Sequence, residues 1–204
     1  SQSGEDFLVN EIFKGHKAGF FVEVGCIDGR RFSNTLHLEE NGWKGICVEA
    51  HAGYIEMLRK NRPNSVICHC AAGEVDEDAV FYANSRGSLS TLDKTQEKRW
   101  KRDFGKYFTG FEEQQVKKMR LDTIFKECGA GKIDFMSLDI EGYEVEALKG
   151  MDFTTYRPTV ILVESDTPEH KKALDDILLQ AGYFEIGNLG GNIFYSLDKG
   201  LSAT

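Results

Sequence analysis

The sequence lacks long apolar runs and has fewer basic than acidic residues. It contains no stretch of about eighteen apolar residues, the length that a membrane-spanning helix needs. Residues 1–6 also lack the charged and apolar regions of a signal peptide. We therefore expect a cytoplasmic protein without a membrane segment. The 33 acidic and 25 basic residues give a formal charge of −8, which disfavours tight binding to a nucleic acid and favours a small or neutral substrate.

The cysteines do not suggest a set of disulfides or of metal ligands. Their number, five, is odd, and we expect most of them to be free thiols in the core. Cys68 and Cys70 flank His69, a spacing that can serve a metal ion. Alternation along a strand would direct both sulfurs to one face with no second ligand pair nearby, whereas zinc takes four ligands. We assign no residue to a metal site.

Apolar, β-branched runs alternate with helical patterns along most of the chain. This alternation predicts a single α/β domain over residues 1–204, with a mostly parallel sheet covered by helices on both faces. The expected strands occupy residues 20–24, 45–48, 65–70, 133–138 and 159–163. The expected helices occupy residues 34–41, 54–60, 143–149 and 169–180.

Two departures from this alternation help to define the fold. Residues 183–186 and 193–196 are predicted to form a hairpin, and hence an antiparallel pair at the end of the sheet. A seven-stranded, Rossmann-like sheet with such a reversed C-terminal strand is typical of class I methyltransferases. The alternation also lapses before residue 121, which indicates an inserted lid or substrate region near residues 84–116. Its basic stretch, residues 94–106, is interpreted as the solvated face of a helix.

Residues 23–29 follow the first apolar run and indicate a ligand site. Glu23 stands near the end of the strand, and Gly25 and Gly29 would let the backbone approach a ligand closely. The next helix offers NH groups and a positive dipole to a carboxylate, such as the one at the methionine end of S-adenosylmethionine. The spacing lacks the middle glycine of a dinucleotide fingerprint. A strand-to-helix turn without a ligand is the alternative.

A second acidic residue follows the next expected strand. Glu49 lies twenty-four positions after Gly25, and a carboxylate there can accept hydrogen bonds from both hydroxyls of a ribose. Ala71 belongs to a run of small residues after the third strand, which would leave room for a flat adenine. Together with residues 23–29, Glu49 and Ala71 favour a site for an adenosyl ligand over a turn without a ligand.

Carboxylates are also expected at the ends of two later strands. Asp139 and Glu141 follow the fourth strand, and Glu164, with Ser165 and Asp166, follows the fifth. Ligands bind at this edge of open α/β sheets. Three interpretations stay open, namely a general base for a substrate hydroxyl, oxygen ligands for a divalent metal, and caps of helix N-termini.

These motifs resemble those of the FkbM family of methyltransferases over nearly the whole chain. The resemblance rests above all on the string from Asp139 to Glu144, and further on residues 21–25, 42–49 and 88–92. It implies a class I fold, S-adenosylmethionine as the methyl donor, transfer to an oxygen, and an Asp139 that faces the transferred methyl. The candidate cofactor contacts are Glu23, Gly25, Asp28, Gly29, Ser33, Asn34, Glu49, Ala71 and Asp139.

The predicted function is therefore transfer of a methyl group from S-adenosylmethionine to a hydroxyl of a small molecule or sugar. The candidate catalytic residues are Asp139, Glu164 and Glu141, and Asp139 would withdraw or orient the hydroxyl proton. A module that holds an adenosyl ligand without chemistry is one alternative.

A ribose 2′-O-methyltransferase of capped RNA is the other alternative. It would combine two acids with two lysines, for which Lys149 and either Lys14 or Lys17 are available. The spacing of these lysines and the net negative charge do not favour this function.

Overall fold

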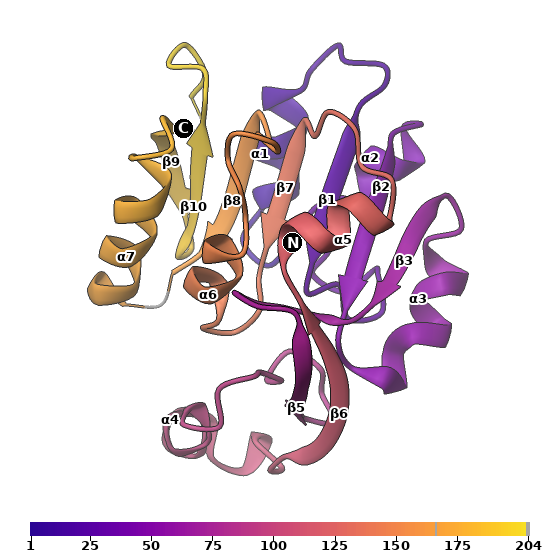
Figure 1. Ribbon diagram of the computed structural model, residues 1–204, viewed down its shortest axis with the longest axis vertical. Coiled ribbons are helices and arrows are strands. Elements are labelled where there is room, and N and C mark those ends of the chain that lie inside the picture. The colour runs from indigo at the N-terminus through magenta and orange to yellow at the C-terminus, as the bar shows by residue number, and fades with distance from the viewer. Residues whose placement is uncertain (166, 203–204) are drawn as a thin grey trace.

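Seven strands form one mixed sheet in the computed structural model, which describes residues 1–165 and 167–202 (Figure 1). The order across the sheet is β3 (Ser65–His69), β2 (Lys44–Glu49), β1 (Phe20–Val24), β7 (Phe135–Leu138), β8 (Val160–Glu164), β10 (Asn192–Ser196) and β9 (Phe184–Leu189). The first five strands in this order are parallel, whereas β10 runs antiparallel to both β8 and β9. The predicted sheet with a reversed C-terminal strand is thus confirmed.

Helices cover both faces of this sheet (Figure 1). Side chains alternate between the two faces along a strand, so each central strand contributes to two apolar clusters. Phe21 of β1 belongs to the cluster that includes Val9, Leu38 and Leu58, from α1 (Glu5–Ile12), α2 (Leu36–Glu40) and α3 (Ile55–Asn61). Its neighbour Val22 belongs to the cluster that includes Ile124, Leu148 and Leu174, from α5 (Leu121–Glu127), α6 (Glu144–Lys149) and α7 (Pro168–Leu178).

A long arm extends from the carboxyl edge of the parallel strands (Figure 1). It consists of β5 (Glu77–Ala83) and β6 (Glu112–Met119), which pair antiparallel, while β4 (Ala71–Ala72) pairs with the base of β6. The sequence interpretation contained no strands here. The reason is that β6 reads EEQQVKKM and is largely exposed, so no apolar run marks it.

The tip of the arm has a small core of its own. Trp100 on α4 (Gln96–Phe104) is buried and packs in a cluster with Leu89 and Phe108. The basic side chains of the same helix face solvent and pair with acidic neighbours, as in Lys101–Glu97 at 2.6 Å. The interpretation of this stretch as a solvated helix face is therefore confirmed.

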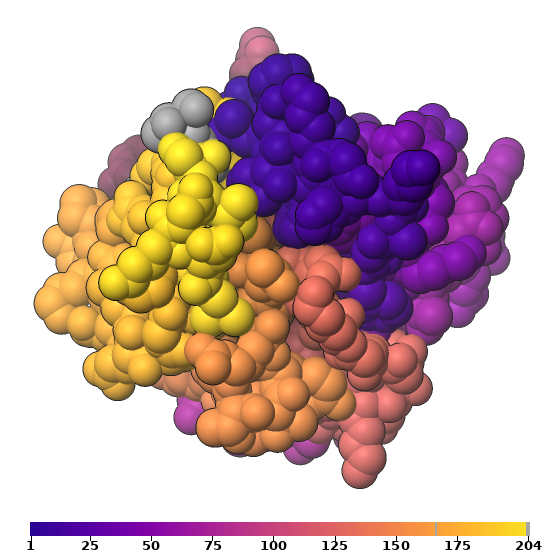
Figure 2. Space-filling model, turned by 90° about the horizontal axis from the view of Figure 1, so that it is seen from above, coloured from indigo at the N-terminus to yellow at the C-terminus, as the bar shows by residue number. Residues whose placement is uncertain are grey.

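The first helix and the last strand lie side by side. Seen from above, the indigo N-terminal segment lies next to the yellow C-terminal segment (Figure 2). Asn192 Nδ2 donates a hydrogen bond to Glu5 Oε1 at 2.9 Å, which joins the first helix to the last strand. None of the helices within the described residues combines the length and the hydropathy required to cross a membrane.

Candidate functional site

A cleft lies at the carboxyl edge of the parallel strands. The loops after β1, β2 and β7 form one side of it, and the arm closes the other side through Gly87, Ser88, Ser90 and Leu92. The structure brings most of the sequence-predicted site residues to this cleft. Those on its wall are Glu23, Gly25, Asn34, Glu49, Ala71, Asp139 and Glu141.

Four other sequence-predicted residues are not part of the cleft wall. Asp28 accepts hydrogen bonds from the backbone NH groups of Arg30 and Arg31 at 2.9 and 2.8 Å, so it shapes the turn. Gly29 lies against the side chain of Arg62. The remaining two are Ser33, whose hydroxyl donates a hydrogen bond to Glu23, and Glu164, which ends β8. Asp166, which the sequence also placed at this edge, lies outside the described residues.

Gly25 lets two backbone segments meet at the floor of the cleft. Its φ of 89° is in the left-handed region, and an added Cβ would lie 1.8 Å from the carbonyl oxygen of Asp139. Its NH donates to the carbonyl of Val48 at 2.9 Å. Only glycine fits at this position, and it leaves backbone rather than side chain on the floor.

The Glu23 carboxylate is held by protein donors. It accepts hydrogen bonds from the Ser33 hydroxyl at 3.0 Å, the Asn34 NH at 2.7 Å and the Thr35 hydroxyl at 2.9 Å, and it pairs with Arg62 Nη1 at 3.0 Å. Glu23 therefore fixes the loop that carries Asn34. The sequence interpretation missed Arg62, because no motif marks a buried arginine at the end of a helix.

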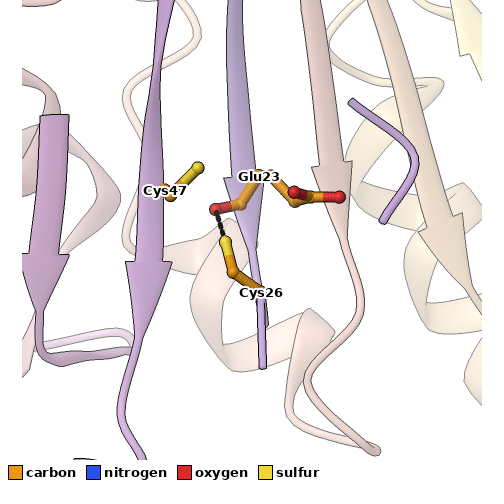
Figure 3. A group of neighbouring side chains, drawn as sticks. All are labelled: Glu23, Cys26 and Cys47. Carbon is orange, nitrogen blue, oxygen red and sulfur yellow. Dashed lines mark hydrogen bonds between the residues drawn. The ribbon is translucent and has the colours of Figure 1, made fainter. Parts of the chain in front are cut away.

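Two cysteines lie near Glu23 (Figure 3). The thiol of Cys26 donates to the backbone carbonyl of Glu23 at 3.0 Å, and the Glu23 carboxylate points away from the sulfurs of Cys26 and Cys47. Burial raises the pKa of the Cys26 thiol, so it stays protonated.

Asn34 presents an acceptor that no described residue uses. Its Nδ2 donates to the Ser137 hydroxyl at 3.2 Å, whereas its buried Oδ1 receives no hydrogen bond. A buried acceptor without a donor is costly, by about 1–3 kcal/mol. Asn34 Oδ1 is thus suited to a ligand that brings an NH donor into the cleft.

Glu49 is a buried carboxylate on the opposite side of Gly25. Its Oε2 accepts from the NH of Ile27 at 2.6 Å, and its Oε1 accepts from the NH of His51 at 2.7 Å. Burial raises the pKa of Glu49 to about 7. Each carboxylate oxygen has a second acceptor site, so Glu49 can also bind ligand hydroxyls.

The loop after β7 is strained and is held from two sides. Glu141 has a φ of 58°, which is uncommon for a residue with a side chain. Glu144 stabilises this loop, because its Oε1 accepts from the NH groups of Ile140 and Gly142 at 2.8 and 3.2 Å. From the arm, the Thr91 hydroxyl donates to the carbonyl of Glu141 at 3.2 Å. Burial raises the pKa of Glu144 to about 8.

The strand order and the cleft at the carboxyl edge define a class I methyltransferase. Within this class, the chain belongs to the FkbM family, because the family model for the methyltransferase FkbM domain matches residues 23–184. The match includes the motifs from Glu23 to Glu144 on which the sequence-based resemblance rested, and it confirms that prediction. No curated protein sequence matches the chain.

Solved structures agree with the fold. The chain resembles the ribosomal protein L11 methylase of Lactobacillus delbrueckii subsp. bulgaricus with a TM-score of 0.53 and 7% identity, over 96% of this chain and 77% of that one. It also matches a TehB-like SAM-dependent methyltransferase of Corynebacterium glutamicum with a TM-score of 0.49 and 10% identity, over 96% and 86% of the two chains. At such identities the likeness concerns the fold alone.

Proposed function

We propose that this protein transfers a methyl group from S-adenosylmethionine to a hydroxyl oxygen of a small molecule or sugar. The observation that carries the proposal is that Asn34, Glu49 and Asp139 line one cleft around the bare backbone of Gly25. A ligand in this cleft therefore meets the unused amide oxygen of Asn34, the buried carboxylate of Glu49, which can accept hydrogen bonds from hydroxyls, and the carboxylate of Asp139. Ligand sites in α/β sheets occur at this edge.

The residues fit S-adenosylmethionine. The orphaned Oδ1 of Asn34 would accept a hydrogen bond from its amino group. Glu49 would accept hydrogen bonds from the ribose hydroxyls, since both carboxylate oxygens retain acceptor capacity. Ala71, which is small and buried in the cleft wall, would leave space for the adenine ring.

Asp139 is the proposed base. When bound, S-adenosylmethionine supplies an electrophilic methyl group on a sulfonium. Asp139 would orient the acceptor hydroxyl and take its proton as the oxygen–methyl bond forms and the sulfur–methyl bond breaks, which leaves a methyl ether and S-adenosylhomocysteine. Orientation of the two reactants contributes on the order of 7–11 kcal/mol. Glu164 is a weaker candidate because it is not on the cleft wall.

The acceptor is assigned to the side of the cleft that the arm closes. Ser88 and Ser90 place hydroxyl groups there, and Leu92 adds an apolar surface. These side chains suit a polar organic molecule of modest size. We propose that the segment between β5 and β6, which overlaps the lid or substrate region expected near residues 84–116, selects the acceptor.

The RNA alternative gains no support from the positions of the lysines. Among the described residues that line the cleft there is no lysine. Lys14 and Lys17 line a separate hollow together with Trp43, next to the amino end of β1. Lys149 stands at the end of α6 and lies 3.7 Å from Glu146.

The test combines cofactor binding with methyl transfer. Calorimetry should show that the protein binds S-adenosylhomocysteine, and labelled S-adenosylmethionine should methylate members of a panel of hydroxyl compounds. Asp139→Asn should lower turnover at least about a hundredfold, the usual contribution of a general base, and leave cofactor affinity within a few-fold. Asp176→Asn, on the exposed face of α7, is the matched control. Cofactor binding without transfer to any acceptor would instead identify a non-catalytic binding module.

A further inference from the structure

Three carboxylates converge beside the cleft. Asp139 follows β7, Glu144 begins α6, and Glu164 ends β8. One oxygen from each lies within 4.8 Å of the oxygens of the other two. Like charges this close repel one another, and a bound cation removes the repulsion. Carboxylate oxygens are also the ligands that Mg²⁺ and Mn²⁺ prefer.

Glu144 points to a ligand independently of this clustering. Its side chain is completely buried, and its Oε1 is fixed by the NH groups of Ile140 and Gly142. Its Oε2 accepts no hydrogen bond from any described residue. Support of the loop accounts for the first oxygen, whereas the second lies 3.4 Å from Nε2 of His170 and receives no hydrogen bond within the described residues. A buried carboxylate oxygen without a hydrogen bond is costly unless something else binds it.

A ring nitrogen lies next to Glu144, beside the group of three carboxylate oxygens. His170 lies in the first turn of α7, and its Nε2 is 3.4 Å from Glu144 Oε2. The first turns of α6 and α7 therefore meet at the carboxyl edge of the sheet (Figure 1). Imidazole is the commonest metal ligand, and in combination with carboxylates it suits a divalent transition metal such as Mn²⁺ better than Ca²⁺.

We infer that Asp139, Glu144 and Glu164, together with His170, form a binding site for a divalent cation of the Mn²⁺ class. The inference rests on the proposed function and deepens it. The cation would bind the hydroxyl oxygen of the acceptor and lower its pKa. Asp139 would then take the proton more readily, through an oxygen that does not hold the cation, as the acceptor oxygen attacks the methyl group. Glu164 would act through the cation. This assignment takes up the divalent-metal interpretation that the sequence left open for these carboxylates, although the sequence alone assigned no residue to a metal site.

Binding of Mn²⁺ to the full chain, without cofactor or acceptor, tests the site directly. The chain is treated with EDTA and desalted, and free Mn²⁺ is followed by its paramagnetic resonance signal. We expect one saturable equivalent. Glu144→Gln and Glu164→Gln should each weaken it at least tenfold, and Glu144→Gln retains an oxygen for the two NH groups of the loop. Circular dichroism should confirm that both variants are folded.

Glu146→Gln is the matched control, because it removes one negative charge from the same helix outside the cluster. It should leave the affinity for Mn²⁺ unchanged. The absence of saturable binding would overturn the cation site, and so would equal affinities in Glu144→Gln and the wild type. A loss in Glu146→Gln as large as in Glu144→Gln would also overturn it, because general negative charge would then explain the binding.

Methyl transfer separates this inference from the proposed function. Transfer that stops in EDTA and returns with Mn²⁺ supports both. Transfer at the full rate in EDTA overturns the role of the cation and leaves the methyltransferase function intact. Saturable Mn²⁺ binding in a protein that neither binds S-adenosylhomocysteine nor methylates any hydroxyl would overturn the proposed function and support the cation site.

Discussion

Arg62 and Glu23 form an ion pair of 3.0 Å in which the arginine side chain is fully buried. Arg62 also pairs with Glu39 through its Nε at 2.7 Å. One side chain at the end of α3 thereby connects β1 and α2, the two elements that carry the first ligand loop between them. Buried charges are stable only when they are paired and hydrogen-bonded, so the three residues depend on one another.

Loss of Arg62 should therefore destabilise the fold strongly. In Arg62→Met two carboxylates stay buried without their cation, which costs about 3–5 kcal/mol in comparable cases. The free energy of unfolding in urea measures this loss. Arg59→Met, at an exposed position of the same helix, is the control and should change stability by less than about 0.5 kcal/mol. Equal losses in the two variants would contradict the role of the buried pair.

Replacement of Gly25 should remove cofactor binding and also lower stability. An alanine Cβ would meet the carbonyl of Asp139, and the positive φ adds strain of about 1–2 kcal/mol. Calorimetry with S-adenosylhomocysteine and urea unfolding measure the two effects. Gly131→Ala, where a Cβ would contact nothing within 4 Å, should change neither quantity. Normal cofactor affinity in Gly25→Ala would exclude the floor of the cleft as the binding surface.

The parallel strands could be predicted from the sequence because they are buried on both faces. A strand such as β8, which reads VILVE, has no polar face, and its apolar run marks its position. The strands β5 and β6 form the arm and do not follow this pattern. The apolar run of β5, residues 79–83, is only partly buried, and β6 has charged residues along an exposed surface. The sequence therefore indicated an insertion at this place but not its structure.

The candidate site could be predicted where backbone geometry or a strand end dictates the residue. Gly25, Glu49 and Asp139 each follow or end a parallel strand, so the edge of the sheet brings them together. Contacts that depend on packing between elements could not be predicted. Arg62 reaches Glu23 across thirty-nine positions, and the sequence carries no sign of this contact.

Asn34 should determine the affinity for the amino-acid part of the cofactor. Its Oδ1 is the unused acceptor in the cleft, so Asn34→Ala should weaken S-adenosylhomocysteine binding by about tenfold, the equivalent of one hydrogen bond. Binding of 5′-methylthioadenosine, which lacks the amino-acid part, should be unaffected. Calorimetry measures the affinity for both ligands. An equal loss of affinity for the two would mean that Asn34 acts by stabilising the loop and not by binding the amino-acid part.

Oxidation should link Cys68 and Cys128. Their sulfurs are 3.0 Å apart, and a bond between them would close a loop that contains the whole arm. Contact with Cys68 raises the pKa of Cys128, so the exchange needs excess oxidised glutathione at alkaline pH, which yields one disulfide and two reduced glutathione molecules. Two of the five thiols should disappear, and the melting temperature should rise by about 5–10 °C. Cys68→Ser should show no such rise.

Cofactor affinity should depend on pH through Glu49. Burial raises the pKa of this carboxyl to about 7, so the free protein holds a proton there at pH 6. Ribose hydroxyls would donate to the ionised carboxylate, and binding would therefore release the proton. The affinity for S-adenosylhomocysteine should change by less than about twofold between pH 7 and 8, and below pH 6 it should fall by about tenfold for each pH unit.

The stability of the free protein should change with pH in the opposite sense. A carboxyl with a raised pKa contributes stability that is complete below the value for the unfolded chain, 4.5, and that is lost as the pH rises through about 7. Glu49→Gln has no proton to exchange, so it should flatten the binding profile and reduce the slope of the stability profile. The remaining slope of the stability profile comes from Glu144, whose pKa burial raises to about 8. Calorimetry and urea unfolding at pH 5.5, 6.5 and 8 on both proteins check this. A binding profile that is equally steep in Glu49→Gln would assign the titration to another group and remove the argument that Glu49 holds the ribose.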